Sequence, residues 1–335
     1  MTACAARWNA EHPEAPVEWS FRSLTAFGDQ PIEDAAQDFD LVVIDHPFCG
    51  RAMETACLLP LDELVPAETL AGLAADAVGP SHDSYAYAGH QWGLATDAAC
   101  QLSAFRPGFE PPETWEDAPA LARRSGSALP LSPPHAISSF LTLCAGEVAA
   151  NEERLVEDEV GERAWATLSA FYACGPAEAL GWEPPETLAR LAAGELDYVP
   201  ITYGYVTYAS ACRFAPVPGL RGGVLGGAGL AVSAASAEPA QAAAFGVWAS
   251  SGEVQRTIVA PAGGQPGSRS AWLDGSAFYS DTLAAHEAAW TRPRDPWWPR
   301  FQLAAGQLLV EALANGTAST VDRLNTLYRA HRNGA

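Results

Sequence analysis

The feature of the sequence that most constrains the fold is an uninterrupted apolar run at residues 41–44, Leu-Val-Val-Ile. The run predicts a strand buried on both faces, as in a parallel sheet covered by helices. Pro47 ends it, because proline cannot continue a central strand. Ligands of open α/β sheets bind at the carboxyl ends of strands, so Asp45 and His46 form a candidate binding edge. The alternative is that Asp45 caps a helix at 51–58 and His46 only packs.

The composition favours a small-molecule partner over a nucleic acid. The chain has 335 residues, enough for two domains, and 48% of them are hydrophobic, enough for real cores. Its formal net charge is −21, and arginine supplies all of the basic residues, since lysine is absent. Phosphate binding needs clustered positive charge, so nucleic acid is not expected as a partner. A neutral or cationic small molecule fits this balance better.

Motifs for catalysis, cofactors and metals are weak or absent. The sequence contains neither G-x-S-x-G nor C-x-x-C, and its seven histidines show no metal-ligand spacing. The seven cysteines therefore do not indicate a disulfide framework or a zinc site. Residues 226–229, Gly-Gly-Ala-Gly, match a dinucleotide fingerprint only in part, because the apolar strand follows them instead of preceding them. The sequence predicts no cofactor, no metal and no catalytic residue.

The start of the chain carries no recognisable export signal. The opening residues lack the basic and apolar regions of a secretion signal. Nowhere does the chain approach the roughly 20 consecutive apolar residues that a membrane-spanning helix needs. The chain as given is therefore not marked for export, which keeps a cytoplasmic protein as an alternative.

A second segment repeats the pattern of a strand followed by an acid. Residues 92–96 predict a strand that ends at Asp97.

Tyr203 and Tyr205 are two residues apart, so in a strand they would project from one face. Flat rings and hydrogen-bonding carboxylates together suit a sugar or another polyhydroxylated ligand, although each ring could instead be ordinary core. The aromatic candidates near strand ends and corners are Trp92, Tyr203, Tyr205, Trp248, Trp297 and Trp298.

The order of several such segments resembles a known family. Each segment is weak alone, but together they span nearly the whole chain, and Pro-x-Thr-Trp at residues 112–115 is moderately specific in this order. The chain resembles extracellular solute-binding proteins of carbohydrate ABC transporters, the maltose-binding-like group known as family 1. The segments that carry the resemblance are 39–46, 58–62, 92–97, 112–117, 194–198, 229–233 and 240–245.

The resemblance implies an α/β, two-lobe fold of the periplasmic-binding-protein type II kind, with a hinge and an inter-lobe cleft. Closure of the hinge would trap the ligand without chemistry. The implied N-terminal lobe comprises 1–98 plus 224–267, the C-terminal lobe 104–218 plus 272–335, and the hinge crossovers 99–103, 219–223 and 268–271.

The resemblance also implies a function, partners and a binding site. The chain would be the substrate-binding component of an ABC importer, extracytoplasmic and membrane-associated through the transporter's membrane subunits, with a carbohydrate as its ligand. The family usually begins with a strand, whereas this chain opens in a helix. The alternative is an intracellular enzyme or sensor on the same scaffold, using Asp45, His46 and Asp97. The implied ligand-binding residues are Asp45, His46, Trp92, Asp97, Tyr203, Tyr205, Gly227, Gln265, Arg269 and Trp298.

Overall fold

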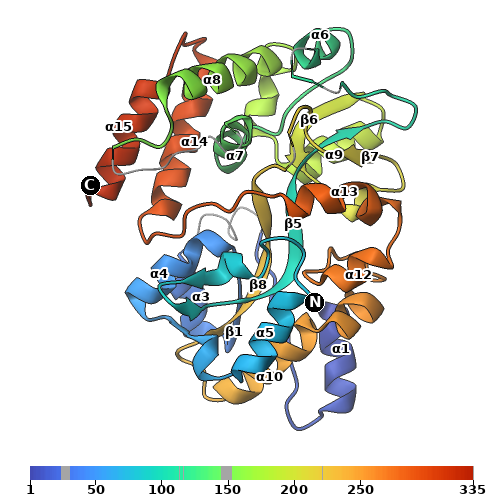
Figure 1. Cartoon of the computed structure of the whole chain (residues 1–335), viewed down its shortest axis with the longest axis vertical. Coiled ribbons are helices and arrows are strands. Elements are labelled where there is room, and N and C mark those ends of the chain that lie inside the picture. Colours follow the sequence, from blue (N-terminus) through green and yellow to red (C-terminus); the bar gives the residue numbers. More distant parts are fainter. Residues whose placement is uncertain (24–30, 113, 116, 145–152, 221, 335) are drawn as a thin grey trace. The chain divides into compact units, whose positions relative to one another are not determined.

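The chain divides into two compact units (Figure 1). The computed structural model describes residues 1–23, 31–112, 114–115, 117–144, 153–220 and 222–334. In these residues no helix is long and apolar enough to cross a membrane. Unit 1 comprises Met1–Ala99, Leu225–Leu283 and Thr291–Pro296, and unit 2 comprises Cys100–Val224, Ala284–Trp290 and Trp297–Ala335.

Two segments cluster differently from the expected lobes. The expected C-terminal lobe took in all of 272–335, but two pieces of that range belong to unit 1. Hydrogen bonds account for this: Tyr279 donates to the carbonyl of Gly264, and Arg292 donates to the carboxylate of Asp45. The division into two ligand-binding lobes joined by hinge crossovers stays a prediction.

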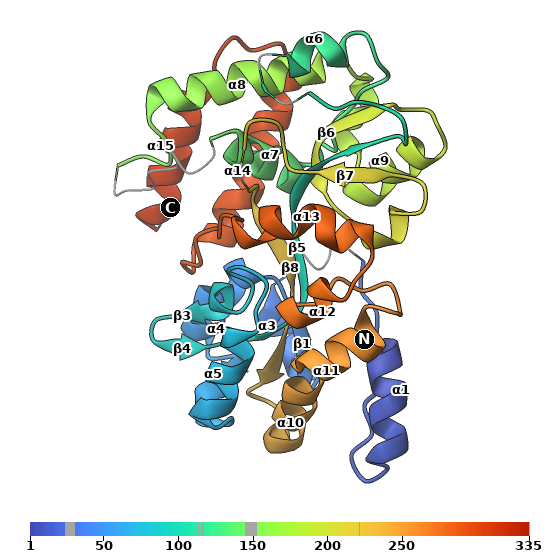
Figure 2. The ribbon, with the colours of Figure 1, turned by 45° about the vertical axis from the view of Figure 1, so that its right-hand side comes forward.

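Unit 1 is built on strands with helices packed against both faces. Strand β8 (Leu225–Ser233) lies between β1 (Leu41–Ile44) and β5 (Leu94–Phe105, which continues into unit 2), and β2 (Leu58–Leu59) also pairs with β8. Strands β3 (Ala86–Tyr87) and β4 (His90–Gln91) form a separate hairpin near α4 (Figure 2). The helices are α1 (Thr2–Glu11), α3 (Ile32–Asp38), α4 (Cys49–Thr55), α5 (Ala67–Ala75), α10 (Pro239–Ser250), α11 (Gly252–Val254), a π-helix (Gln255–Val259), α12 (Arg269–Leu273) and α13 (Ala277–Glu287, which ends in unit 2).

Strand β1 is covered on both faces, but its pairing with β8 is antiparallel. The pairing extends from Leu41 to Ile44, so the predicted parallel arrangement is wrong for this pair. On one face Val42 and Ile44 pack against α3 and α4. On the other face Leu41 and Val43, both partly buried, pack against α1 and α10. The apolar run thus reflects helices on both sides of the strand, which an antiparallel pair also permits.

Unit 2 combines a small sheet with a group of helices. Strand β5 pairs antiparallel with β6 (Tyr198–Tyr203) and β7 (Arg213–Ala215). Glu113 and Glu116 of the 112–117 motif lie outside the described residues. The helices are α6 (Ala118–Ala122), α7 (Pro133–Leu143), α8 (Asp158–Tyr172), α9 (Pro184–Ala192), α14 (Trp298–Ala314) and α15 (Val321–Arg332).

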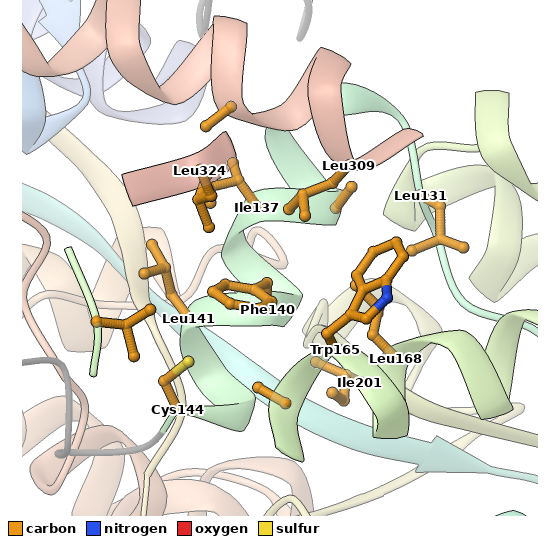
Figure 3. Close-up of a cluster of buried hydrophobic side chains, with 14 of the residues drawn as sticks. Leu131, Ile137, Phe140, Leu141, Cys144, Trp165, Leu168, Ile201, Leu309 and Leu324 are labelled. Carbon is orange, nitrogen blue, oxygen red and sulfur yellow. The ribbon is translucent and has the colours of Figure 1, made fainter. Parts of the chain in front are cut away.

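Helices α7, α8, α14 and α15 enclose a hydrophobic core of unit 2 (Figure 3). Phe140 of α7 and Trp165 of α8 are among its largest fully buried side chains. Helix α14 approaches α7 closely because Gly306 has no side chain: a Cβ there would lie 2.0 Å from the carbonyl oxygen of Pro133. This core holds α7 in place against β6, the strand that ends in Tyr203.

Candidate functional site

Asp45 leaves the end of β1 in an extended conformation and does not cap a helix. A 3-10 turn, His46–Phe48, follows it and leads directly into α4. Helix α4 begins and ends earlier than the predicted helix at 51–58, because Leu58 joins β2. Neither the turn nor α4 receives a side-chain cap, so the capping role considered for Asp45 is wrong.

The carboxylate of Asp45 forms a buried ion pair with Arg292. Nη2 of Arg292 donates to both carboxylate oxygens, at 2.8 Å each. Burial alone would raise the pKa of Asp45, but the charge of Arg292 and the neighbouring His46 outweigh it and lower this pKa to about 2. The sequence analysis missed Arg292, because no spacing rule links a residue in Thr-Arg-Pro-Arg to one 247 positions earlier.

The imidazole of His46 is completely buried beside this ion pair. Its Nδ1 lies 3.3 Å from Oδ1 of Asp45. Within the described residues, neither ring nitrogen has a hydrogen bond of normal geometry. Burial and the charge of Arg292 lower the pKa of His46 to about 4, against the opposing effect of Asp45. The ring is therefore neutral at pH 7, with one nitrogen able to donate and the other able to accept.

Asp97 lies inside a long strand, not at the end of a short one. Strand β5 runs from Leu94 to Phe105, so the predicted end of the strand at Asp97 is wrong. The apolar residues that follow Asp97 belong to the same strand and not to a connection after it. Burial raises the pKa of Asp97 to about 6, and the opposing hydrogen bond from a backbone amide is long, at 3.4 Å.

Two other predicted site residues meet Asp97. The backbone amide of Gln265 donates the long hydrogen bond to Oδ1 of Asp97. One backbone and one side-chain hydrogen bond also join Gln265 to Ala98. Gly227 of β8 has a φ of 107°, and a Cβ there would lie 2.3 Å from the carbonyl oxygen of Asp97. Only glycine fits this position, because both the backbone angle and the space exclude a side chain. The structure thus brings Asp97, Gly227 and Gln265 together.

Tyr85 is a buried tyrosine close to this part of unit 1, and no local sequence pattern predicts it as a site residue. Its ring is fully buried and lies against β8, where a Cβ on Gly229 would approach the ring to 2.7 Å. Its hydroxyl donates to the carbonyl of Ile44 at 3.4 Å. Burial, followed by the charges of Asp45 and Asp97, raises the pKa of Tyr85. The buried phenol therefore stays protonated at neutral pH.

Trp92 and Arg269 have other surroundings in unit 1. Trp92 is buried in the same apolar cluster as Tyr85, and its indole donates to the carbonyl of Tyr87 at 3.0 Å. Arg269 begins α12 with an exposed side chain, and its backbone amide donates to the carbonyl of Asp76. Their described contacts are thus with core and backbone groups, and their binding roles stay predictions.

In unit 2, the two tyrosines do not share a strand face. Strand β6 ends at Tyr203, so Tyr205 lies beyond the strand, before a 3-10 turn at Val206–Tyr208. The buried ring of Tyr203 packs edge-on against His135, with centroids 5.8 Å apart. Nε2 of His135 is 2.7 Å from a carboxylate oxygen of Glu183. The ligand contacts expected of both tyrosines remain predictions.

Trp298 is a core residue in this conformation. Its ring is fully buried at the start of α14 and packs on Phe301, with ring centroids 5.1 Å apart. Its indole donates to Gln302 of the same helix at 3.3 Å. A ligand could reach this ring only after a rearrangement that uncovers it.

The sequence matches one protein family over most of its length. The profile of the family described as bacterial extracellular solute-binding protein matches residues 25–287. A search of curated proteins finds no match. The family match confirms the resemblance that the order of sequence segments indicated.

Solved structures show the same fold at low sequence identity. Maltose-bound MalE3 of T. maritima is 16% identical, with a TM-score of 0.81 over 99% of this chain and 95% of its own. The GacH receptor of Streptomyces glaucescens is 17% identical, with a TM-score of 0.81 over 99% and 93%. The maltotriose-binding protein of Thermus thermophilus is 20% identical, with a TM-score of 0.75 over 98% and 95%. These similarities confirm the predicted two-lobe α/β fold class.

Proposed function

Because the chain belongs to the bacterial extracellular solute-binding protein family, we propose that it binds a sugar or another small polyhydroxylated molecule for an ABC importer. It would act outside the cytoplasm and pass its ligand to the importer's membrane subunits. Similar structures support this ligand class, since they contain bound maltose, tagatose, maltotriose and ribitol.

The observation that carries the proposal is the chemistry of the Asp45–His46 edge. The charge of Asp45 is balanced by Arg292, and His46 is neutral, so these three groups together carry little net charge. An edge of this kind suits an uncharged ligand. Hydroxyl groups both donate and accept hydrogen bonds, which matches a carboxylate beside a neutral imidazole.

The same geometry favours binding over acid–base catalysis by these residues. A general acid or base needs a pKa near the working pH. Asp45 stays ionised far below neutral pH, and His46 stays neutral, so neither exchanges protons readily at pH 7. Of the three residues in the enzyme alternative, Asp97 has the pKa nearest to neutral pH, at about 6. Maltose recovered unchanged after long incubation with the protein supports this view. Glucose released from maltose and detected by chromatography would instead support the alternative function as an enzyme.

Titration calorimetry with maltose, maltotriose, tagatose and ribitol tests the proposal directly. We expect at least one of them to bind with a Kd in the micromolar range or tighter. Asp97→Asn is expected to weaken that binding, while Asp274→Asn, the same change at an exposed position of unit 1, is its matched control. A well-folded sample that binds none of the four, and carries no sugar detectable by native mass spectrometry, would contradict the proposal.

A further inference from the structure

We propose that Arg292 is a positioning residue for the ligand-binding edge of unit 1. Its guanidinium fixes the carboxylate of Asp45, and this carboxylate is in contact with the ring of His46. This inference rests on the proposed function, because it concerns the same edge. Arg292 is only 4% exposed and donates to both oxygens of Asp45, and one of those oxygens lies 3.3 Å from His46 Nδ1. The three side chains therefore form one connected, buried row.

The segment that carries Arg292 is itself held against this edge. Residues 291–296, Thr-Arg-Pro-Arg-Asp-Pro, form a strap that belongs to unit 1, although unit 2 residues precede and follow it in the chain. Nη1 of Arg294 donates to the carbonyls of Asp83 and Ser84, at 3.1 and 3.3 Å. Prolines 293 and 296 restrict the backbone of the strap. The guanidinium of Arg292 is thus presented by a constrained segment.

Gly50 makes the contact between the strap and α4 possible. Its amide donates to the carbonyl oxygen of Arg294 at 2.9 Å. A Cβ on Gly50 would lie only 2.0 Å from that oxygen, so any side chain here would displace the strap. Gly50 is in the first turn of α4, directly after the turn that contains His46. The strap, the turn and the helix therefore pack as one corner.

The position of the His46 ring matters because its Nε2 has no hydrogen-bond partner in the described part of the chain. A buried polar atom without a partner is unfavourable unless something else binds it. The groups that face the ring are Asp45, Arg292, Arg294 and the edge of Tyr85, whose centroid lies 6.3 Å away. Two positive charges and one negative charge around a buried ring favour its neutral form. The ring is completely buried, so a ligand hydroxyl could bind this neutral Nε2 only after a rearrangement that uncovers it.

The test compares Arg292→Gln, Arg292→Lys and Gly50→Ala with two control variants. Arg51→Gln removes another arginine of this corner, and Gly72→Ala adds a Cβ to α5 where nothing lies within 4 Å. The first readout is the titration of His46 by NMR of the imidazole. R292Q removes a positive charge that lowers the pKa of His46, so this pKa is expected to rise from about 4 towards its ordinary value of 6.5. G50A should change it in the same direction, and the controls should not.

The second readout is the affinity for maltose, or for another sugar that binds the wild type. A buried hydrogen-bonding group that loses its partner typically weakens binding by between about tenfold and a hundredfold, so we expect a loss of affinity of that size in R292Q and G50A. R292K should restore much of it, because a lysine ammonium can still pair with Asp45. An unchanged His46 titration in folded R292Q and G50A would overturn the inference. If the wild type binds no sugar, the proposed function fails, while the His46 titration still decides whether Arg292 positions the ring.

Discussion

Asp45 and Asp97 are the same residue type in the same unit, yet their environments shift their pKa values in opposite directions. Asp45 follows the end of β1 and meets a guanidinium from a distant segment, which lowers its pKa to about 2. Asp97 lies inside β5, where it meets one long backbone hydrogen bond, and burial raises its pKa to about 6. The charge of an acid in the folded chain therefore depends on which groups the rest of the chain places against it.

Asp45→Asn should produce the largest effect, because it leaves Arg292 buried without its carboxylate. Removing one partner of a buried ion pair typically costs about 3–5 kcal/mol, and we expect a loss of that size in the free energy of unfolding at pH 7. Urea denaturation followed by tryptophan fluorescence measures it. A loss below about 1 kcal/mol would mean that Arg292 is satisfied by its other contacts, and the contrast with Asp97 would weaken.

His46→Gln should change the pH dependence of stability on the Asp45 side of the comparison. The pKa of His46 is lowered to about 4 in the folded protein, so its contribution is complete above pH 6.5 and is lost as the pH falls towards 4. A shift of this size corresponds to about 3 kcal/mol. As the pH falls from 6.5 to 4, the wild type should therefore lose stability that H46Q keeps. The difference in free energy of unfolding between the two proteins should shift in favour of H46Q. A constant difference across this range would contradict the lowered pKa.

Asp97→Asn should stabilise the protein at pH 7, in contrast to Asp45→Asn. The pKa of Asp97 is raised to about 6, so the folded state is most favoured below pH 3.8 and loses stability as the pH rises through 6. Because the side chain is partly exposed, we expect a gain of between about 1 and 3 kcal/mol at pH 7. The gain should disappear in unfolding measured at pH 4. A destabilised D97N variant at pH 7 would show that its ionised form is well solvated.

The local sequence predicts the elements of this fold better than their partners. The apolar run at 41–44 is a strand covered on both faces, as its composition predicts. Whether β1 pairs parallel or antiparallel depends on β8, almost 190 residues later, and no local pattern encodes it. The pattern of a strand followed by an acid predicts that the strand ends at Asp97, but β5 continues through this residue, whose pKa is raised by burial.

For the candidate site too, local sequence predicts single residues better than their contacts with distant residues. Asp45 and Asp97 were predicted as site residues because each acid follows an apolar run in the local sequence, whereas Gly227 was implied only by the family resemblance, and all three roles stay predictions. The local sequence does not identify Arg292 or Tyr85, whose roles exist only through contacts with residues distant in sequence. A weak signal for Arg292 was present in the two arginines and two prolines of residues 291–296, a constrained and charged segment between two helices. The composition of this segment does not indicate that Arg292 pairs with Asp45.

Arg51→Gln should have the smallest effect, and it completes the comparison by separating burial from charge pairing. Arg51 binds Glu33 and Glu54, but its side chain is 24% exposed, compared with 5% for Arg292. Water solvates the charges that remain after the substitution, so we expect a loss below about 1 kcal/mol in urea denaturation at pH 7. High salt should shrink this loss further, because exposed pairs are screened, whereas the loss in Asp45→Asn should persist. Equal losses in R51Q and D45N would mean that the number of ionic contacts, and not burial, determines the stability of this corner.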